Sequence, residues 1–175
     1  MIVPYRDKTP RMGKDVFVAP GAAVIGDVTV GDSSSIWFNA VVRGDVNFVR
    51  IGDFTNVQDS CVLHVTTREF PLYIGNSVTI GHGCILHGCK IGNRCLIGMG
   101  AVILDGAEVG EGSLIASGSV VLQDAKIPPR TLVAGIPAVK KRDVDTDTLQ
   151  MIERSAAEYV ELARKYTVGG GQAAG

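Results

Sequence analysis

Several features that are common in other proteins are missing from this sequence. It has no run of about 18 or more apolar residues, the length that crosses a membrane as a helix. The N-terminal stretch Met1 to Arg6 lacks the basic and then apolar layout of a secretory signal. The formal net charge is −1, so no excess of one sign favours nucleic acid or an anionic membrane as a partner. These absences predict a soluble, cytoplasmic protein without nucleic-acid or membrane partners.

Cysteines and aromatic residues are also scarce. Only 6% of the residues are aromatic, and the chain has four cysteines, Cys61, Cys84, Cys89 and Cys95. A thiolate zinc site is conceivable, but no pair has the C-x-x-C spacing typical of such sites. Three of them stand at the same small position of a repeat and Cys89 stands near it, so we expect all four to fill corners or the core.

The sequence is instead rich in glycine, with 22 residues, and in a short repeat. Each six-residue unit begins with an aliphatic residue, often followed by glycine, and has a small residue at its fifth position. The first positions are Val18, Val24, Val30, Ile36, Val42, Ile51, Val57, Leu63, Ile74, Ile80, Leu86, Ile91, Ile97, Ile103, Val109, Ile115, Val121, Ile127 and Val133.

A period this short predicts an all-β solenoid. Branched first positions suit a buried pleated surface, and glycine with small residues suits tight corners between short strands. The pattern resembles the left-handed parallel β-helix family, in which three units make one turn of a triangular prism. The units imply about six turns, and a core of small and branched side chains fits the hydrophobic content of 46%.

The pattern divides the chain into four parts. An N-terminal segment covers residues 1–17 and the β-helix domain covers residues 18–138, where Pro137 cannot donate to a further ladder. Residues 139–167 form a polar connector and an amphipathic C-terminal α-helix, which begins at the capping cluster Asp145 to Thr148. Residues 168–175 are expected to be a flexible tail.

The repeat also places the three histidines. His64 and His87 are second residues of units that are three apart, so they stack on one face about 4.8 Å apart. This count requires five extra residues within Val65 to Tyr73 to bulge out as a loop. His82, a third residue, lies on a different face and has Asp59 one turn below it in its column.

If the three histidines share one metal ion, a single chain cannot hold it. Zinc–nitrogen bonds are about 2.0 to 2.1 Å long, and two faces of one prism are too far apart for that. A cyclic homotrimer solves the problem, because the face with His64 and His87 of one protomer can meet the face with His82 of the next. The alternative interpretation is three solvated surface histidines.

The motifs, taken together, resemble one known family over almost the whole chain. Arg43-Gly-Asp45, Asn56-Val-Gln58-Asp59, His64 and His82-x4-His87-Gly88 match the γ-class carbonic anhydrases and their bacterial short-loop relatives in order and spacing. The resemblance implies zinc, or iron or cobalt, bound by His64, His87 and the adjacent subunit's equivalent of His82. It implies reversible hydration of carbon dioxide to bicarbonate by a metal-bound hydroxide.

The resemblance assigns roles to the neighbouring residues as well. Gln58 matches a residue near the metal-bound solvent, and Asn56 matches a residue that supports it. Arg43, Asp45 and Asp59 match a charged network between subunits, although they could equally form a simple interface ion-pair cluster. Tyr159 resembles a tyrosine that some short-loop relatives bring near the site, and helix packing would explain it equally well.

Two positions depart from the family pattern. Prototype members carry glutamates, one of them a proton shuttle, where this chain has Thr67 and Val46, and Glu69 is the only carboxylate in the short loop. Loss of general acid–base help costs about 10² to 10⁴-fold, so hydration is expected to be slow. The alternatives are a metal-dependent acyl-coenzyme A thioesterase, a hexapeptide acyltransferase and a non-catalytic metal-binding or assembly protein. An acyltransferase needs only one histidine, which argues against that branch.

Overall fold

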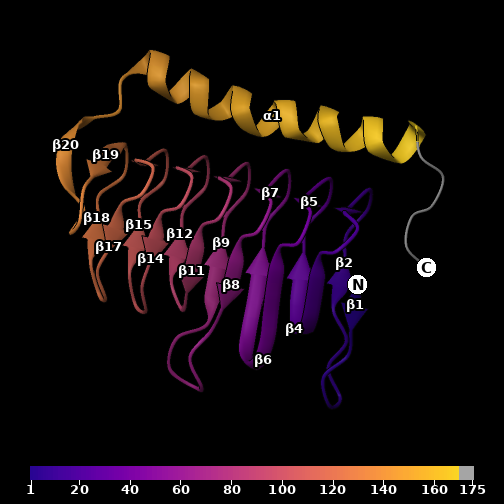
Figure 1. The fold of residues 1–175 in the computed structure, drawn as a ribbon. Helices are drawn as coiled ribbons and strands as arrows, with labels where there is room; N and C mark the ends of the chain where they lie inside the picture. Colours follow the sequence, from indigo (N-terminus) through magenta and orange to yellow (C-terminus); the bar gives the residue numbers. More distant parts are fainter. Residues whose placement is uncertain (170–175) are drawn as a thin grey trace.

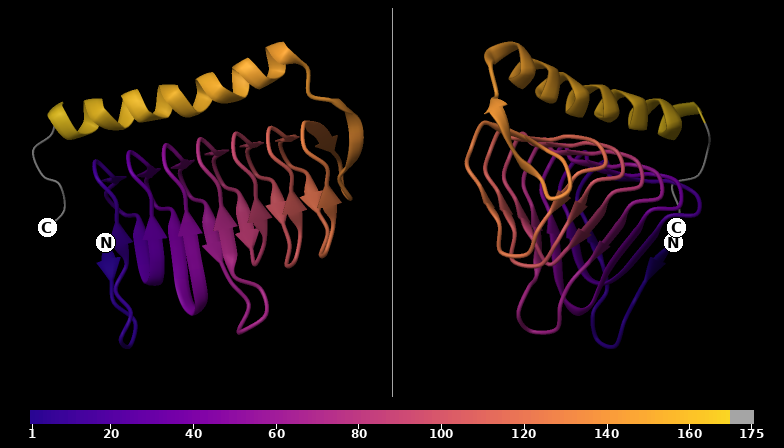
Figure 2. Two further views of the ribbon diagram at one scale, coloured as in Figure 1. Left: turned by 180° about the vertical axis from the view of Figure 1, so that it is seen from behind. Right: turned by 60° about the vertical axis from the view of Figure 1, so that its left-hand side comes forward.

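The structure is a computed structural model that describes residues 1–169. It is a left-handed parallel β-helix of about seven turns with one long helix laid along its side (Figure 1). The predicted fold class is confirmed. Seen along its length, each coil is a triangle with three flat sides (Figure 2).

We name the three sides by what their outer surfaces carry. The helix face consists of β3 (Phe17–Val18), β5 (Ser35–Ile36), β7 (Asn56–Val57), β10 (Thr79–Ile80), β13 (Leu96–Ile97), β16 (Leu114–Ile115) and β19 (Thr131–Ala134). The histidine face consists of β1 (Ile2–Val3), β8 (Val62–His64), β11 (Ile85–His87), β14 (Val102–Ile103), β17 (Val120–Val121) and the first halves of β4 (Ala23–Val30) and β6 (Val41–Ile51). The charged face consists of β2 (Arg11–Met12), β9 (Leu72–Ile74), β12 (Lys90–Ile91), β15 (Glu108–Val109), β18 (Lys126–Ile127) and the second halves of β4 and β6.

The first coil lies earlier in the chain than the repeat predicted. β1 and β2 pair in parallel with β4, Ile2 opposite Val24 and Arg11 opposite Thr29. Residues before Val18 therefore add a coil, which explains about seven turns where the units implied six. This segment lacks the six-residue period, so counting units could not detect it.

The last coil is also finished differently. We expected a polar connector after Ala138, but β20 (Val139–Asp143) pairs antiparallel with β19. The final strand of a solenoid leaves a row of unpaired backbone groups, and an added antiparallel strand covers them. All five residues of β20 are exposed, and Lys140 to Asp143, the last four of them, are charged.

The first position of each unit points into the prism. Leu63, Leu86 and Ile103, for example, follow one another in register across β8, β11 and β14 and are fully buried. The four cysteines are unpaired and buried, as predicted. Burial raises the pKa of the Cys95 thiol to about 11, so this group stays protonated and inert at neutral pH.

Removing one of these side chains should be costly. We expect Leu86→Ala to lower the free energy of unfolding by about 2 to 5 kcal/mol, because the rigid stack cannot collapse around the cavity. Leu122→Ala is a matched control, since Leu122 is 49% exposed and should change stability by less than about 0.5 kcal/mol. Denaturant unfolding measures both, and equal losses would contradict this view of the core.

The corners explain the glycines at the second position. At one edge of the helix face, Asp32, Asp53, Asn76 and Asn93 form a ladder in which each side chain accepts the backbone N–H of the residue one coil below, at 2.8 to 2.9 Å. A Cβ atom at Gly52 would lie 2.2 Å from Oδ1 of Asn76. The ladder therefore requires glycine beside it.

The helix α1 (Thr146–Gly169) covers the helix face, as Figures 1 and 2 show. Asp145 accepts the backbone N–H of Thr148 at 2.8 Å and caps its N-terminus, as predicted. Its own residues Ile152, Ala156 and Ala163 are buried against the solenoid. The helix extends to Gly169, and the rest of the predicted tail, residues 170–175, lies outside the described residues. Among residues 1–169, no helix combines the length and apolarity required to cross a bilayer.

Candidate metal centre

His64 and His87 lie side by side on the histidine face. They are in register between β8 and β11, which is the register that counting repeats predicted. Nδ1 of His64 lies 3.1 Å from Nε2 of His87, and the ring centroids are 5.1 Å apart. The five-residue excursion between β8 and β9 is present, so the loop preserves the stack.

A carboxylate backs each of the two rings. Nε2 of His64 lies 3.0 Å from Oδ1 of Asp45, and Nδ1 of His87 lies 2.8 Å from Oδ1 of Asp105. Burial alone would raise the pKa of Asp45, but hydrogen bonds from His64 and Arg43 outweigh it and hold the pKa below its usual value. Ionised carboxylates only accept hydrogen bonds, so in each ring the nitrogen that faces the aspartate carries a proton.

When both rings are neutral, this arrangement turns two lone pairs toward each other. Two acceptor nitrogens at 3.1 Å repel unless a cation lies between or beside them. Two imidazoles on one tetrahedral zinc ion have nitrogens about 3.3 Å apart, given bonds of about 2.0 to 2.1 Å. The donor set and its spacing therefore fit a metal ion, and the aspartates would fix both ligands.

His82 lies in the turn between β10 and β11, at the corner of the prism where the helix face ends. Sequence counting placed it on another face, and the structure places it at the edge of that face. Its Nδ1 lies 2.7 Å from Oδ2 of Asp59, one coil below as predicted. Its Nε2 lies 3.5 Å from the hydroxyl of Tyr159 on α1.

The corner with His82 and the pair of His64 and His87 occupy opposite edges of the histidine face. His87 follows His82 by five positions, which span at most roughly 16 Å of extended chain. Within one chain, residues 1–169 contain no group of three His, Cys, Asp or Glu side chains that could hold a metal.

A buried amide network supports the corner. The side-chain carbonyl of Gln58 accepts the backbone N–H of His82 at 3.2 Å, and Nε2 of Gln58 donates to Oδ1 of Asn56 at 3.1 Å. Asn56 in turn donates to the hydroxyl of Thr79 at 3.0 Å, and this hydroxyl donates to Ser155 of α1 at 3.3 Å. The orientation of the Gln58 amide is fixed, which leaves one N–H of its Nε2 free to donate.

Arg43 and Val46 lie next to Asp45 in β6. Arg43 forms an ion pair with Asp45, and the backbone N–H of Val46 donates to the same carboxylate at 2.9 Å. Thr67 lies in the loop beside Thr66, whose hydroxyl donates to Oδ2 of Asp105 at 2.9 Å. Asp105 was missed by the sequence analysis, although it is 18 residues after His87 and thus about one coil on.

The outer surfaces of the three faces differ in character. On the histidine face the outward residues in register are Val41, Val62, Ile85, Val102 and Val120. On the charged face they are Arg50, Tyr73, Lys90, Glu108 and Lys126. The histidine face thus carries a bare apolar column beside His64 and His87, with Val62 and Ile85 each more than 40% exposed.

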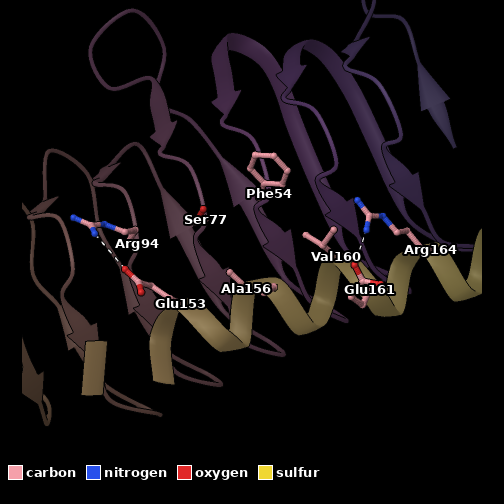
Figure 3. Close-up of a pocket in the computed structure, with 9 residues that line it drawn as sticks. Phe54, Ser77, Arg94, Glu153, Ala156, Val160, Glu161 and Arg164 are labelled. Atoms are coloured by element: carbon pink, nitrogen blue, oxygen red, sulfur yellow. Dashed lines mark hydrogen bonds and ion pairs between the residues drawn. The ribbon is translucent and has the colours of Figure 1, made fainter. Parts of the chain in front are cut away.

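A cavity of about 450 Å³ lies elsewhere, between α1 and the ladder corner of the helix face (Figure 3). Phe54 lines it from the solenoid and Ala156 and Val160 from α1, and ion pairs of Arg94 with Glu153 and of Arg164 with Glu161 lie along it. None of the predicted site residues lines it. The hollow is therefore separate from the histidines.

Comparison with known proteins agrees with the motifs. The model of the family described as bacterial transferase hexapeptide (six repeats) matches residues 9–44, 72–105 and 88–123. A Methanocaldococcus jannaschii protein named "Probable carbonic anhydrase" is 51% identical, over 87% of this chain and 95% of its own. The carbonic anhydrase of Geobacillus kaustophilus is 46% identical, over 95% of this chain and 91% of its own.

Solved structures share the fold over nearly the full length. A Bacillus cereus protein provisionally assigned as an acetyltransferase is 47% identical, with a TM-score of 0.94 over 97% of this chain and 98% of its own. A hexapeptide transferase family protein from Anaplasma phagocytophilum is 38% identical, with a TM-score of 0.90 over 95% and 98% of the two chains. From these likenesses and the motifs that it carries, the chain belongs to the γ-class carbonic anhydrase family of hexapeptide-repeat proteins.

Proposed function

We propose that the protein is a zinc-dependent carbonic anhydrase that interconverts carbon dioxide and bicarbonate at the subunit interfaces of a homotrimer. The observation that carries the proposal is the pair His64 and His87, whose ring nitrogens face each other at 3.1 Å while a carboxylate holds each ring from behind. Relatives named carbonic anhydrase support the same substrate. Iron or cobalt could replace zinc at a site of this type.

The third ligand would come from the next protomer. His82 lies at the opposite edge of the histidine face from His87, so a cyclic arrangement can bring the corner of one chain against the pair of another. The apolar column supports this, because Val62 and Ile85 would lose their exposure in such an interface. Exposed Met99, which follows His82 in the same corner column, offers apolar surface on the other side.

Zinc, when bound, lowers the pKa of a coordinated water to about 7 and so supplies the nucleophile for hydration. The chain's own residues would position that reaction. Asp45 and Asp59 hold the imidazoles of His64 and His82 by hydrogen bonds of 3.0 and 2.7 Å. Arg43, paired with Asp45, would lie beside the interface and help to bind the anionic product.

Gln58 is the residue that we propose to contact substrate. Because its carbonyl is held by His82 and its amide by Asn56, the free N–H can donate to an oxygen of carbon dioxide as negative charge develops there. We expect Gln58→Ala to lower kcat for hydration by about 10²-fold with the metal content unchanged. Stopped-flow assays with parallel elemental analysis would measure this, and an unchanged kcat would exclude Gln58 from the reaction.

Proton removal is the weak step of the proposed enzyme. Val46 has no ionisable group and Thr67 has no carboxylate to act as a proton shuttle, and the hydroxyl of Tyr159 lies 3.5 Å from Nε2 of His82. Burial and the charge of Asp59 raise the pKa of Tyr159, so its phenol stays protonated at neutral pH. We therefore propose a slow hydration that depends on buffer, with Tyr159 acting as a hydrogen-bond donor.

The decisive experiment pairs metal analysis with activity. Anaerobically purified protein is analysed for zinc, iron and cobalt per trimer, and hydration is measured by stopped flow for the wild type and His82→Ala. We expect one metal ion per interface and hydration only in the wild type. If the metal is present without hydration, thioester hydrolysis should be assayed next; activity there would favour the acyl-coenzyme A thioesterase, and inactivity would favour a metal-binding or assembly role. No metal, even after it is added, would refute both enzymes.

A further inference from the structure

Asp105 contacts His87, a candidate metal ligand, although Asp105 belongs to none of the sequence motifs. It lies after β14, one coil beyond His87, and its Oδ1 is 2.8 Å from Nδ1 of His87. The side chain is 26% exposed, so the contact lies at the edge of the core and is partly shielded from water. The hydrogen bond assigns the ring proton of His87 to Nδ1 and leaves Nε2 with its lone pair toward His64.

The Asp105 carboxylate is itself held in place. Its second oxygen accepts the hydroxyl of Thr66 at 2.9 Å, and the side chain of Asn47 donates to the carbonyl of Thr66 at 3.0 Å. Thr66 belongs to the loop between β8 and β9, so hydrogen bonds to both Asp105 and Asn47 hold this loop in place. Gly88 leaves room for the carboxylate, because a Cβ atom there would lie 2.1 Å from Oδ1 of Asp105.

The next coil has an aspartate, Asp124, at the same corner, but no histidine beside it. Asp124 donates its backbone N–H to the carbonyl of Asp105 at 2.9 Å, and a Cβ atom at Gly106 would lie 2.1 Å from Oδ1 of Asp124. Leu104 there takes the position that His87 has in the coil before. An aspartate at this corner therefore has a structural use of its own, and contact with a histidine is the feature peculiar to Asp105.

We propose that Asp105 is a positioning residue of the metal centre: it fixes the tautomer and orientation of His87 and couples them to the loop through Thr66. The inference rests on the proposed metal site. Carboxylates behind a ligating histidine orient the ring and make it a stronger ligand, and their loss typically costs about 10- to 100-fold in metal affinity.

The test compares Asp105→Ala, the conservative Asp105→Asn and the control Asp124→Ala in the full-length protein. Long-range ¹H–¹⁵N spectra report which ring nitrogen of His87 carries the proton. We expect a proton on Nδ1 in the wild type, Asp105→Asn and Asp124→Ala, and its loss or transfer in Asp105→Ala. Zinc affinity, measured by chelator competition, should fall about 10- to 100-fold in Asp105→Ala, less in Asp105→Asn, and not in Asp124→Ala.

The outcomes separate the two proposals. A wild type that binds no zinc refutes the proposed function, while the spectra still decide the role of Asp105 in the metal-free protein. An unchanged Nδ1 proton in Asp105→Ala, or the same zinc affinity as in Asp124→Ala, overturns the inference. If Asp105→Ala does not fold, Thr66→Val serves instead; it removes one anchor of the carboxylate and should weaken zinc binding about fivefold, and an unchanged affinity would count against the inference.

Discussion

Co-assembly of two inactive variants, His64→Ala and His82→Ala, is expected to restore activity. Alone, each variant lacks one proposed ligand at every interface and should hydrate carbon dioxide no faster than the uncatalysed reaction. In a mixed trimer, the His82→Ala chain still has His64 and His87, and the His64→Ala chain still has His82. Where these two chains meet in the right order, the interface has all three histidines. Random mixing of equal amounts makes about a quarter of the interfaces complete, so about a quarter of the wild-type rate should return.

A second mixture controls this experiment. His64 and His87 lie on the same face of the same chain, so mixing His64→Ala with His87→Ala cannot complete any interface. Stopped-flow hydration and bound zinc should therefore stay at background in that mixture. Restoration in both mixtures, or in neither, would contradict a site shared between His82 and the histidine pair of a neighbour.

The second large effect is expected from a substitution that touches no proposed ligand. Ile85 points outward from β11 in the apolar column and is 43% exposed. Ile85→Glu would place an unpaired carboxylate in the proposed interface, which costs several kcal/mol, or about 10³-fold in association. The variant should sediment as a folded monomer, bind zinc weakly and lose hydration although all three histidines remain.

Lys90→Glu provides the matched control. Lys90 points outward from β12 on the charged face, among Tyr73 and Glu108. A charge introduced there stays in water, so the trimer, zinc content and hydration rate should match the wild type. Analytical ultracentrifugation and circular dichroism distinguish dissociation from unfolding. An Ile85→Glu variant that remains trimeric would show that another face makes the interface.

The parts of the molecule that follow the six-residue period could be predicted from sequence. The buried positions, the three-sided coil and the register of His64 with His87 all depend on counting units, and the loop before Ile74 adds residues without changing the face. The first coil and β20 could not be predicted, because residues 1–17 and 139–143 depart from the period and join the sheets through pairing alone.

The contacts of the site were only partly predictable for a related reason. Repeat counting gives the coil and the face of a residue but not the direction of its side chain near a corner. Asp59 was placed below His82 because both fall at the same position of their units. Asp105 sits at a corner where Asp124 recurs one coil on, so its sequence context does not distinguish a contact with His87 from an ordinary corner.

The helix α1 has a consequence for how the molecule unfolds. In a solenoid each coil contacts only its neighbours, so coils can fray one at a time from either end. Here α1 starts next to the last coil and runs back over β10, β7, β5 and β3, and Tyr166 near its end packs against Phe17 and Trp37 of the early coils. The helix thus connects the last coil with the first ones. A coil that separates from the stack also loses its contacts with α1, which weakens the contacts of α1 with the other coils. The whole fold is therefore expected to unfold in a single cooperative step.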